Sequence, residues 1–225
     1  MTKEDLKIKN MYDLNYTEAK DAFKGAEYPW EVLPGIRDFI RSYGPTLHPD
    51  EYTEVKPHVW IHKTARVFDS AYFAEDIIIG PETEIRQCAF LRGSIIVGKG
   101  CVIGNSCELK NVIIFDSVQV PHYNYVGDSI LGYKSHMGAA SLTSNVRSDK
   151  KLVVVHASDG DIATGLKKFG AMLSDHVEVG CGSVLNPGTC IGRNTNIYPL
   201  SSVRGCVPAD SIYKGKNDIV PKTEE

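Results

Sequence analysis

The chain of 225 residues carries 25 lysine and arginine residues against 28 aspartate and glutamate residues, a formal net charge of −3. This balance, with no basic stripe, disfavours nucleic acid as a partner and favours a small molecule. The length suits one buried core with a small extension. No apolar run is long enough for a signal peptide or a membrane helix, so we expect a cytoplasmic protein.

Cysteine spacing gives no sign of a metal centre. No C-x-x-C pair occurs among the six cysteines, which stand at positions 88, 101, 107, 181, 190 and 206. In a reducing compartment such thiols are usually free and buried. We therefore expect neither disulfides nor structural zinc.

Residues 1–55 form the first predicted unit, a helical N-terminal cap. Segments 17–23 and 33–40 have the composition of short amphipathic helices, and Gly25 and Gly44 stand where these helices would end. The terminal coil of a repeat structure exposes apolar side chains and unpaired strand edges. We therefore interpret this unit as a cap on the repeats that follow, rather than as a separate functional domain.

A period of six residues dominates residues 56–216. Every sixth residue from Ile61 to Phe115 is apolar, and Pro121 ends this run. A second series begins at Leu173 and continues to Val203. A fixed period indicates a solenoid. The alternative architecture, a β-sandwich, would show a turn about every 8–12 residues.

Each six-residue repeat predicts a short strand followed by a corner. Glycine often follows the repeat residue directly, and glycine tolerates the positive φ that a sharp corner needs. Three such sides close a triangular coil of 18 residues, which pairs in parallel with the next coil at a spacing of about 4.8 Å. The sequence therefore predicts an all-β parallel β-helix with Cys101 and Cys107 in its interior. The handedness of the helix does not follow from the period.

Two regions interrupt the repeat, and one follows it. Between Pro121 and Leu131 the step between apolar positions becomes ten, and residues 146–171 carry charge and glycine without a hexad. We expect excursions from the coil near 121–131 and at 146–171, and such excursions often carry binding and catalytic groups. Residues 217–225 are predicted to form a polar C-terminal tail.

Arg92 and Lys110 each come directly after a repeat residue and are 18 residues apart. The coil therefore stacks them at one corner, where two cations repel each other unless an anion lies between them. A phosphate accepts such a pair well. A solvated surface pair is the equal alternative, in which Glu108 simply neutralises Lys110.

His122 stands beside the break in the repeat. A neutral imidazole accepts a proton near pH 7, which an amine must lose when it attacks a thioester. The later histidines, His136, His156 and His176, follow at separations of 14, 20 and 20 residues, so no two successive histidines of this series stack on neighbouring coils. We therefore expect no metal site.

Several segments together resemble the acetyltransferase domain of bifunctional N-acetylglucosamine-1-phosphate uridylyltransferase/glucosamine-1-phosphate acetyltransferase. The resemblance covers roughly residues 55–216 and rests on both the letters and their spacing. The matching segments are Arg92 with Glu108-Leu109-Lys110, residues 122–128 (HYNYVGD), residues 138–145 (GAASLTSN), residues 168–171 (KFGA) and residues 186–189 (NPGT). It implies a hexapeptide-repeat transferase with a left-handed β-helix that assembles as a homotrimer.

The resemblance also implies roles for individual residues. It makes His122 the general base and places Glu108 in support of the site. Substrate contacts would come from Arg92 and Lys110 on a sugar 1-phosphate and from Tyr125, His136 and Asn145 on the sugar. Acetyl-CoA, the implied co-substrate, would lie along Ala139 and Cys181, with its phosphates near Arg204, Lys214 or Lys216.

Two departures from the family bear on the substrate. His136 stands where the family commonly carries an asparagine that contacts the sugar, and Ala140 replaces a usual glycine. These departures leave the acceptor sugar open. Residues 1–55 are too short for the family's nucleotidyltransferase domain, so we expect no uridylyl transfer.

Three functions compete at this point. The first is an acetyl-CoA-dependent N-acetyltransferase acting on a phosphorylated or nucleotide-linked amino sugar. The second is a non-catalytic trimeric module that binds a sugar nucleotide or a separate nucleotidyltransferase. The third, a metal-dependent enzyme similar to γ-class carbonic anhydrases, predicts stoichiometric zinc.

Overall fold

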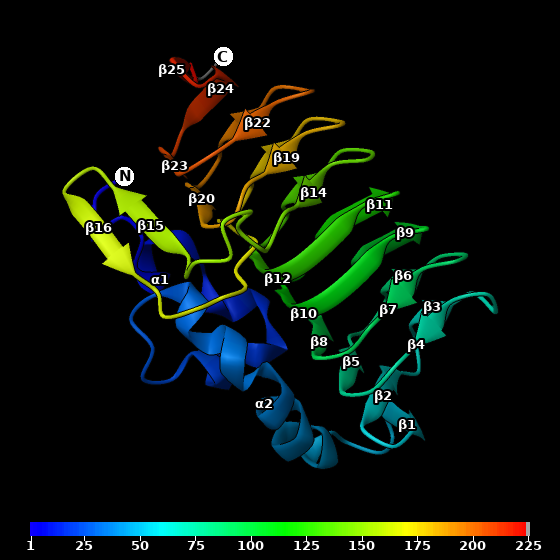
Figure 1. Ribbon diagram of the computed structural model, residues 1–225. Coiled ribbons are helices and arrows are strands. Elements are labelled where there is room, and N and C mark those ends of the chain that lie inside the picture. Colours follow the sequence, from blue (N-terminus) through cyan, green and yellow to red (C-terminus); the bar gives the residue numbers. More distant parts are fainter. Residues whose placement is uncertain (224–225) are drawn as a thin grey trace.

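The computed structural model describes residues 1–223 and shows a parallel β-helix with a helical segment along one side (Figure 1). The strands of the coil pair in parallel with strands one coil further on, as in the pairing of Val59 with Ile77 and of Ile77 with Ile95. The predicted fold class is thereby confirmed.

Three faces make up the prism, and we name them by their surroundings. The covered face contains β2 (Val59–His62), β5 (Ile77–Ile79), β8 (Ile95–Val97), the second halves of β10 (Glu108–Ile114) and β12 (Tyr125–Leu131), β17 (Ala171–Leu173), β20 (Thr189–Ile191) and β23 (Cys206–Val207). The second face contains β3 (Arg66–Val67), β6 (Glu84–Ile85), β9 (Val102–Asn105), β11 (Gln119–His122), β13 (His136–Met137), β18 (Glu178–Val179), β21 (Asn196–Ile197) and β24 (Ser211–Gly215). The third face contains β4 (Tyr72–Phe73), β7 (Phe90–Leu91), the first halves of β10 and β12, β14 (Leu142–Thr143), β19 (Val184–Leu185) and β22 (Ser202–Val203).

The repeat residues fill the interior of the prism. From Ile79 to Leu109 they are at most 1 % exposed, and the thiols of Cys101 and Cys107 are buried among them, as predicted. Burying an aliphatic side chain of this size stabilises the fold by about 1.5–3 kcal/mol, so the stack is the main source of stability.

The predicted excursion near 121–131 was wrong, because β11 and β12 keep this segment in the coil. Ile114 pairs with Val97 and Leu131 pairs with Ile114, so the coil here repeats after 17 residues instead of 18. Each shortened coil lacks one residue at a corner, which shifts the hexad frame without breaking the strand pairing. Phe115 consequently lies outside the prism, fully buried against the rings of Tyr12 and Phe23 at centroid distances of 5.2 and 5.8 Å.

The segment 144–170 does leave the coil, between β14 and β17. It forms the antiparallel hairpin of β15 (Val154–Ala157) and β16 (Gly160–Ala163). The chain then returns to the prism, where the amide of Ala171 donates to Ser129 Oγ, 42 residues earlier, at 3.0 Å. The hairpin lies beside the N-terminus, since the amide of Ser158 donates to the carbonyl of Met1 (Figure 1).

Residues 1–46, which we call the cover, lie along a side of the prism rather than over its end (Figure 1). The expected cap on a terminal coil is thus corrected. Short helices make up the cover: α1 (Ile8–Met11), η1 (Leu14–Tyr16), η2 (Glu18–Phe23), η3 (Pro29–Gly35), α2 (Ile36–Tyr43) and η4 (Gly44–Thr46). Its position follows from the outward side chains of the covered face, which are apolar and at most 1 % exposed: Ile78, Ile96, Ile113, Ile130 and Met172.

Both ends of the prism carry an antiparallel strand. β1 (Tyr52–Lys56) pairs with β2 at the first coil, and β25 (Asp218–Pro221) pairs with β24 at the last. Part of the predicted polar tail, 217–225, is therefore a strand, while residues 224–225 lie outside the described residues. Within residues 1–223, no helix has the length and apolar character needed to cross a bilayer.

Candidate active site

The corner between the third and covered faces gathers charged side chains, and we call it the cation corner. Arg92 and Lys110 follow Leu91 and Leu109, which pair on neighbouring coils. Each cation has its own carboxylate: Arg92 Nη1 lies 2.7 Å from Glu108 Oε1, and Lys110 Nζ lies 2.9 Å from Asp128 Oδ1. Glu108 therefore neutralises Arg92 and not Lys110, the partner considered from the sequence.

Asp128 organises this corner, and the sequence analysis did not single it out. The residue is 3 % exposed, and its carboxylate accepts from Lys110 Nζ, from Asn111 Nδ2 at 3.0 Å and from Asn145 Nδ2 at 2.5 Å. Its φ of 48° lies in the left-handed region, which aspartate tolerates better than most residues. The sequence does contain a signal for this contact, because Asp128 stands 18 residues after Lys110, which is one period of the predicted coil.

Tyr125 and Asn145 complete the corner on the next coils. Asn145 Nδ2 lies 3.1 Å from Tyr125 Oη. Burial raises the pKa of the Tyr125 phenol, and the nearby Asp128 carboxylate raises it further, so the phenol stays protonated as a donor. Gly127 permits this contact: a Cβ there would lie 2.5 Å from Tyr125 Oη.

His122 lies at the opposite end of the third face, at the corner with the second face, and we call this the imidazole corner. The buried Asn124 fixes the backbone there: its Oδ1 accepts from the amide of His122 at 3.0 Å, and its Nδ2 donates to the carbonyl of Gly138 at 2.8 Å. The imidazole of His122 is exposed and has no hydrogen-bond partner within residues 1–223.

Small residues continue the imidazole corner along the prism. The amide of Ala140 donates to the carbonyl of His122 at 2.9 Å, and the amide of Gly182 donates to the carbonyl of Ala139 at 2.8 Å. Ala139 and Cys181 therefore belong to the same column as His122. The Cys181 thiol is free and exposed.

His136 lies on the second face, one coil beyond Gln119. Its Nδ1 is 2.8 Å from Glu178 Oε2, the outward residue of the next coil. A carboxylate at Nδ1 favours the tautomer whose Nε2 is free to accept a proton. His136, which the family resemblance places in substrate binding, thus has an oriented ring, whereas His122 has no such partner within residues 1–223.

The two corners are close but separate within one chain. His122 precedes Tyr125 by three residues, which an extended chain spans in at most about 10 Å. At the cation corner, in contrast, Lys110 and Asn145 both contact Asp128, and Asn145 also contacts Tyr125. The cation corner and His122 therefore lie at opposite ends of one short face.

The three cations assigned to the phosphates of the co-substrate are not gathered in one place. Arg204 lies on the cation corner, where its Nη2 donates to Asn186 Oδ1 at 3.3 Å. Lys214 lies on β24, with its Nζ 6.0 Å from the centre of the Tyr198 ring. Lys216 is exposed between β24 and β25.

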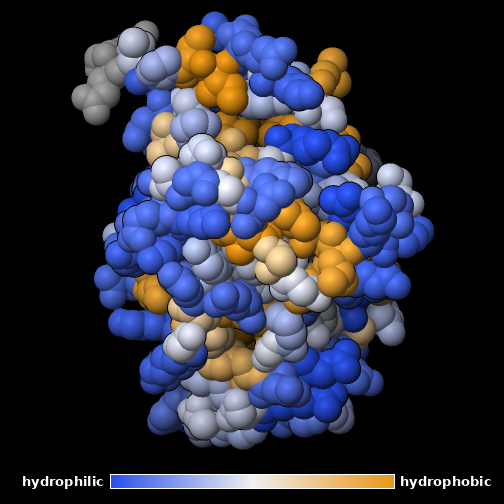
Figure 2. Space-filling view, turned by 60° about the vertical axis from the view of Figure 1, so that its left-hand side comes forward, coloured by the Kyte–Doolittle hydropathy of each residue, from blue (hydrophilic) through white to orange (hydrophobic). Residues whose placement is uncertain are grey.

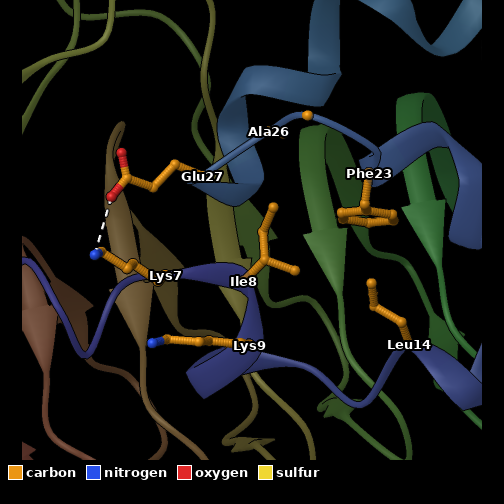
Figure 3. Close-up of a pocket in the computed structure, with 8 residues that line it drawn as sticks. Lys7, Ile8, Lys9, Leu14, Phe23, Ala26 and Glu27 are labelled. Atoms are coloured by element: carbon orange, nitrogen blue, oxygen red, sulfur yellow. Dashed lines mark ion pairs between the residues drawn. The ribbon is translucent and has the colours of Figure 1, made fainter.

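The cover contains a hollow of about 560 Å³ that is separate from both corners. Ile8, Leu14 and Phe23 converge on it, while Lys7 forms an ion pair with Glu27 at 3.0 Å on its rim (Figure 3). Figure 2 shows that apolar side chains gather near the middle of this side of the molecule, with hydrophilic ones around them. Because Glu27 neutralises Lys7, this ion pair gives the hollow no free charge to bind a ligand. We therefore place the candidate site at the corners of the prism. No group of three metal-binding side chains occurs within residues 1–223.

Comparison with known proteins assigns the family. A putative uncharacterized acetyltransferase of Escherichia coli, YaiX, is 30% identical over 165 residues, and the match spans 65% of this chain and 71% of that protein. The chain belongs to the hexapeptide-repeat transferases related to the acetyltransferase domain of GlmU. Its coil is the left-handed parallel β-helix of that family.

Other similarities of this hexapeptide-repeat transferase are partial. The bifunctional protein GlmU of Methanococcus aeolicus is 33% identical over 136 residues, which are 60% of this chain and 33% of that protein. The chain spans about a third to half of the length of the curated GlmU proteins that it matches. A hexapeptide transferase family protein from Anaplasma phagocytophilum has a similar structure, with a TM-score of 0.42 and 16% identity over 75% of this chain and 82% of that one. No family model matches the chain.

Proposed function

We propose that the protein is an acetyl-CoA-dependent N-acetyltransferase that acts on an amino-sugar phosphate such as glucosamine 1-phosphate. The observation that carries the proposal is the cation corner, where Arg92 and Lys110 lie on neighbouring coils beside the hydrogen-bonded pair of Tyr125 and Asn145. His122 lies at the other end of the same face. The related proteins are named acetyltransferases, which supports an acetyl group as the group transferred.

The cation corner retains donors for a phosphate although both cations are paired. Among the described residues, Arg92 donates to Glu108 through Nη1, which leaves its Nε and Nη2 hydrogens. Lys110 has three hydrogens, and its only carboxylate partner within residues 1–223 is Asp128. Tyr125 and Asn145 then face the sugar ring with a phenol and an amide, which suit hydroxyl groups.

Acetyl transfer in this site needs one proton acceptor. The sugar amine attacks the thioester carbonyl, the C–N bond forms, the C–S bond breaks, and the CoA thiolate leaves. His122 takes the proton that the amine loses and returns it to the thiolate. Ala139 and Cys181, in the same column, leave room beside the imidazole for a narrow pantetheine arm.

The proposed assembly is a homotrimer. In such an assembly the clefts between adjacent prisms join the corners of neighbouring chains, so one site draws residues from more than one chain. This arrangement would bring the cation and imidazole corners to opposite walls of one cleft. The phosphates of acetyl-CoA would meet Arg204, Lys214 or Lys216.

Thiol release from acetyl-CoA tests the proposal, with glucosamine 1-phosphate and related amino sugars as acceptors. His122→Ala should lower kcat by roughly 10²–10⁴-fold, while the oligomer measured by light scattering stays intact. His156→Ala is the matched control, because this exposed histidine lies on the hairpin and pairs with Asp161 at 2.8 Å. Absence of turnover with every acceptor would count against the enzyme.

One observation favours a second function, a non-catalytic sugar-nucleotide-binding or regulatory partner of a separate nucleotidyltransferase. The imidazole of His122 lacks a hydrogen-bond partner within residues 1–223, whereas a general base is usually oriented by one. Capture of a nucleotidyltransferase by the purified protein, with silent acetyl transfer, would support this function over the enzyme.

A further inference from the structure

Two cysteines lie in register on neighbouring strands of the covered face (Figure 1). Cys190 on β20 pairs with Cys206 on β23, and both thiols are free. In-register residues of parallel strands are about 4.8 Å apart and point to the same side of the sheet. Disulfides join residues whose Cα atoms are about 4.4–6.8 Å apart. Within residues 1–223 no other two cysteines are paired by the strands, so the backbone singles out this pair for a bond between coils.

The two thiols differ in their access to solvent. Each precedes an interior residue, Ile191 or Val207, so both side chains point outward from the prism. Cys190 is fully buried, whereas Cys206 is partly exposed. Burial raises the pKa of the Tyr12 phenol in the cover, and the nearby Cys190 thiol raises it further, which places Cys190 beneath the cover. A reagent from solvent therefore reaches Cys206 first.

The acidity of the two thiols differs in the same sense. A hydrogen bond with the Cys190 thiol lowers the pKa of Cys206, while burial raises the pKa of Cys190 well above its usual range. The thiolate is the nucleophilic form of cysteine. Cysteines that react with oxidants are typically accessible, low in pKa and next to a second cysteine that resolves the product. Cys206 suits the first role and Cys190 the second.

We propose that Cys206 and Cys190 form a hydroperoxide-reactive site, in which oxidation joins two coils by a reversible disulfide. The Cys206 thiolate attacks hydrogen peroxide, the O–O bond breaks, hydroxide leaves, and Cys206 becomes a sulfenic acid. The Cys190 thiol then gives up its proton, its sulfur bonds to that of Cys206, and the sulfenic hydroxyl leaves as water. Two electrons pass from the thiols to the peroxide, and a thiol reductant reverses the bond.

This site is independent of the proposed acetyl transfer. The pair lies on the covered face, whereas the cation and imidazole corners lie at the two ends of the third face. The sequence analysis did not single the pair out, because its members are 16 residues apart instead of the 18 of the predicted coil. A bond here ties β23, near the end of the prism, to the coil before it.

Mass spectrometry of the full chain after treatment with hydrogen peroxide tests the site. The protein should lose two hydrogen atoms, regain them with dithiothreitol, and yield cross-linked peptides that contain Cys190 and Cys206. In Cys190→Ala the sulfenic acid at Cys206 has no resolving thiol, so its trapping by dimedone should rise at least about tenfold over the unsubstituted protein. Cys206→Ser leaves the buried thiol in place and should abolish the cross-link whether or not Cys190→Ala folds.

Cys88→Ala is the matched control, because Cys88 is free and exposed and has Ser70, not a cysteine, on the neighbouring coil. The cross-link should form in this variant as in the unsubstituted protein. The site is overturned if peroxide leaves both thiols reduced, if the bond joins other cysteines or two chains, or if the cross-link survives Cys206→Ser. None of these results depends on thiol release from acetyl-CoA, so the site and the proposed function fail separately.

Discussion

Removal of the Asp128 charge is the perturbation that tests the cation corner most directly. The Asp128 side chain is 4 % exposed and pairs with Lys110, whose side chain is 27 % exposed. Asp128→Asn keeps the shape and the left-handed φ of 48°, which asparagine also tolerates, so the variant removes chiefly the charge. It leaves Lys110 without a counter-charge in a partly desolvated place.

The expected loss of stability lies between two limits. An exposed ion pair contributes about 0–1 kcal/mol to the free energy of unfolding, and breaking a fully buried pair lowers it by about 3–5 kcal/mol. Since the carboxylate is buried and the lysine is partly exposed, we expect Asp128→Asn to lower the free energy of unfolding by about 2 kcal/mol. Asp128→Ala should lose about 1–2 kcal/mol more, because alanine is strained at this φ.

Urea unfolding followed by circular dichroism measures both losses. A double-mutant cycle with Lys110→Met should give a coupling energy of about 1–2 kcal/mol, since the partners are in contact. Glu75→Gln is the control: this carboxylate is 78 % exposed and lies 3.9 Å from Arg41, so the substitution should cost less than about 0.5 kcal/mol. A coupling energy near zero would refute the role given to Asp128.

Three further predictions concern separate parts of the molecule. Gly127→Ala should displace the Tyr125 hydroxyl and raise the KM for the sugar with little change in kcat, as steady-state kinetics would show. Phe115→Ala should lower the free energy of unfolding by about 3–5 kcal/mol in urea titrations, because the ring is fully buried beneath the cover. Burial raises the pKa of the Cys101 thiol to about 12, so at pH 8 a thiol reagent should modify exposed Cys88 and spare Cys101 until the protein unfolds.

Contrary outcomes would be informative in each case. An unchanged KM in Gly127→Ala would mean that Tyr125 does not meet the sugar. A loss below about 1 kcal/mol for Phe115→Ala would mean that the cover contributes little to stability. Equal reaction of Cys88 and Cys101 in the native protein would contradict the interior position of Cys101.

The stacking of Arg92 on Lys110 could be predicted, because a parallel coil places residues one period apart on neighbouring strands. The ion pairs of these cations could not, since they depend on how each side chain turns at the corner. Glu108 precedes Lys110 by two residues in the sequence, and yet its carboxylate binds Arg92 on the adjacent coil. Local proximity along the chain therefore gave the wrong partner.

The position of His122 could likewise be predicted from the sequence only in part. Its place was inferred from an apparent break in the hexads, but the break is a shift of one residue and the strands pair through it. Parallel pairing tolerates a corner that is one residue shorter, whereas a fixed count of six does not. The histidine nevertheless lies at a corner, where the side chain points to solvent.

The sequence by itself determined the prism, because a side chain that points inward at every sixth residue must be apolar for the coil to close. Tertiary structure alone decided where the cover lies: outward isoleucines such as Ile78 and Ile113 are buried only because residues 1–46 pack on them. It also decided that Asp128 joins Lys110 to Asn145, a contact between three coils. The physical reason is that repeat spacing fixes the backbone, while the contacts of side chains on different coils depend on the packed molecule.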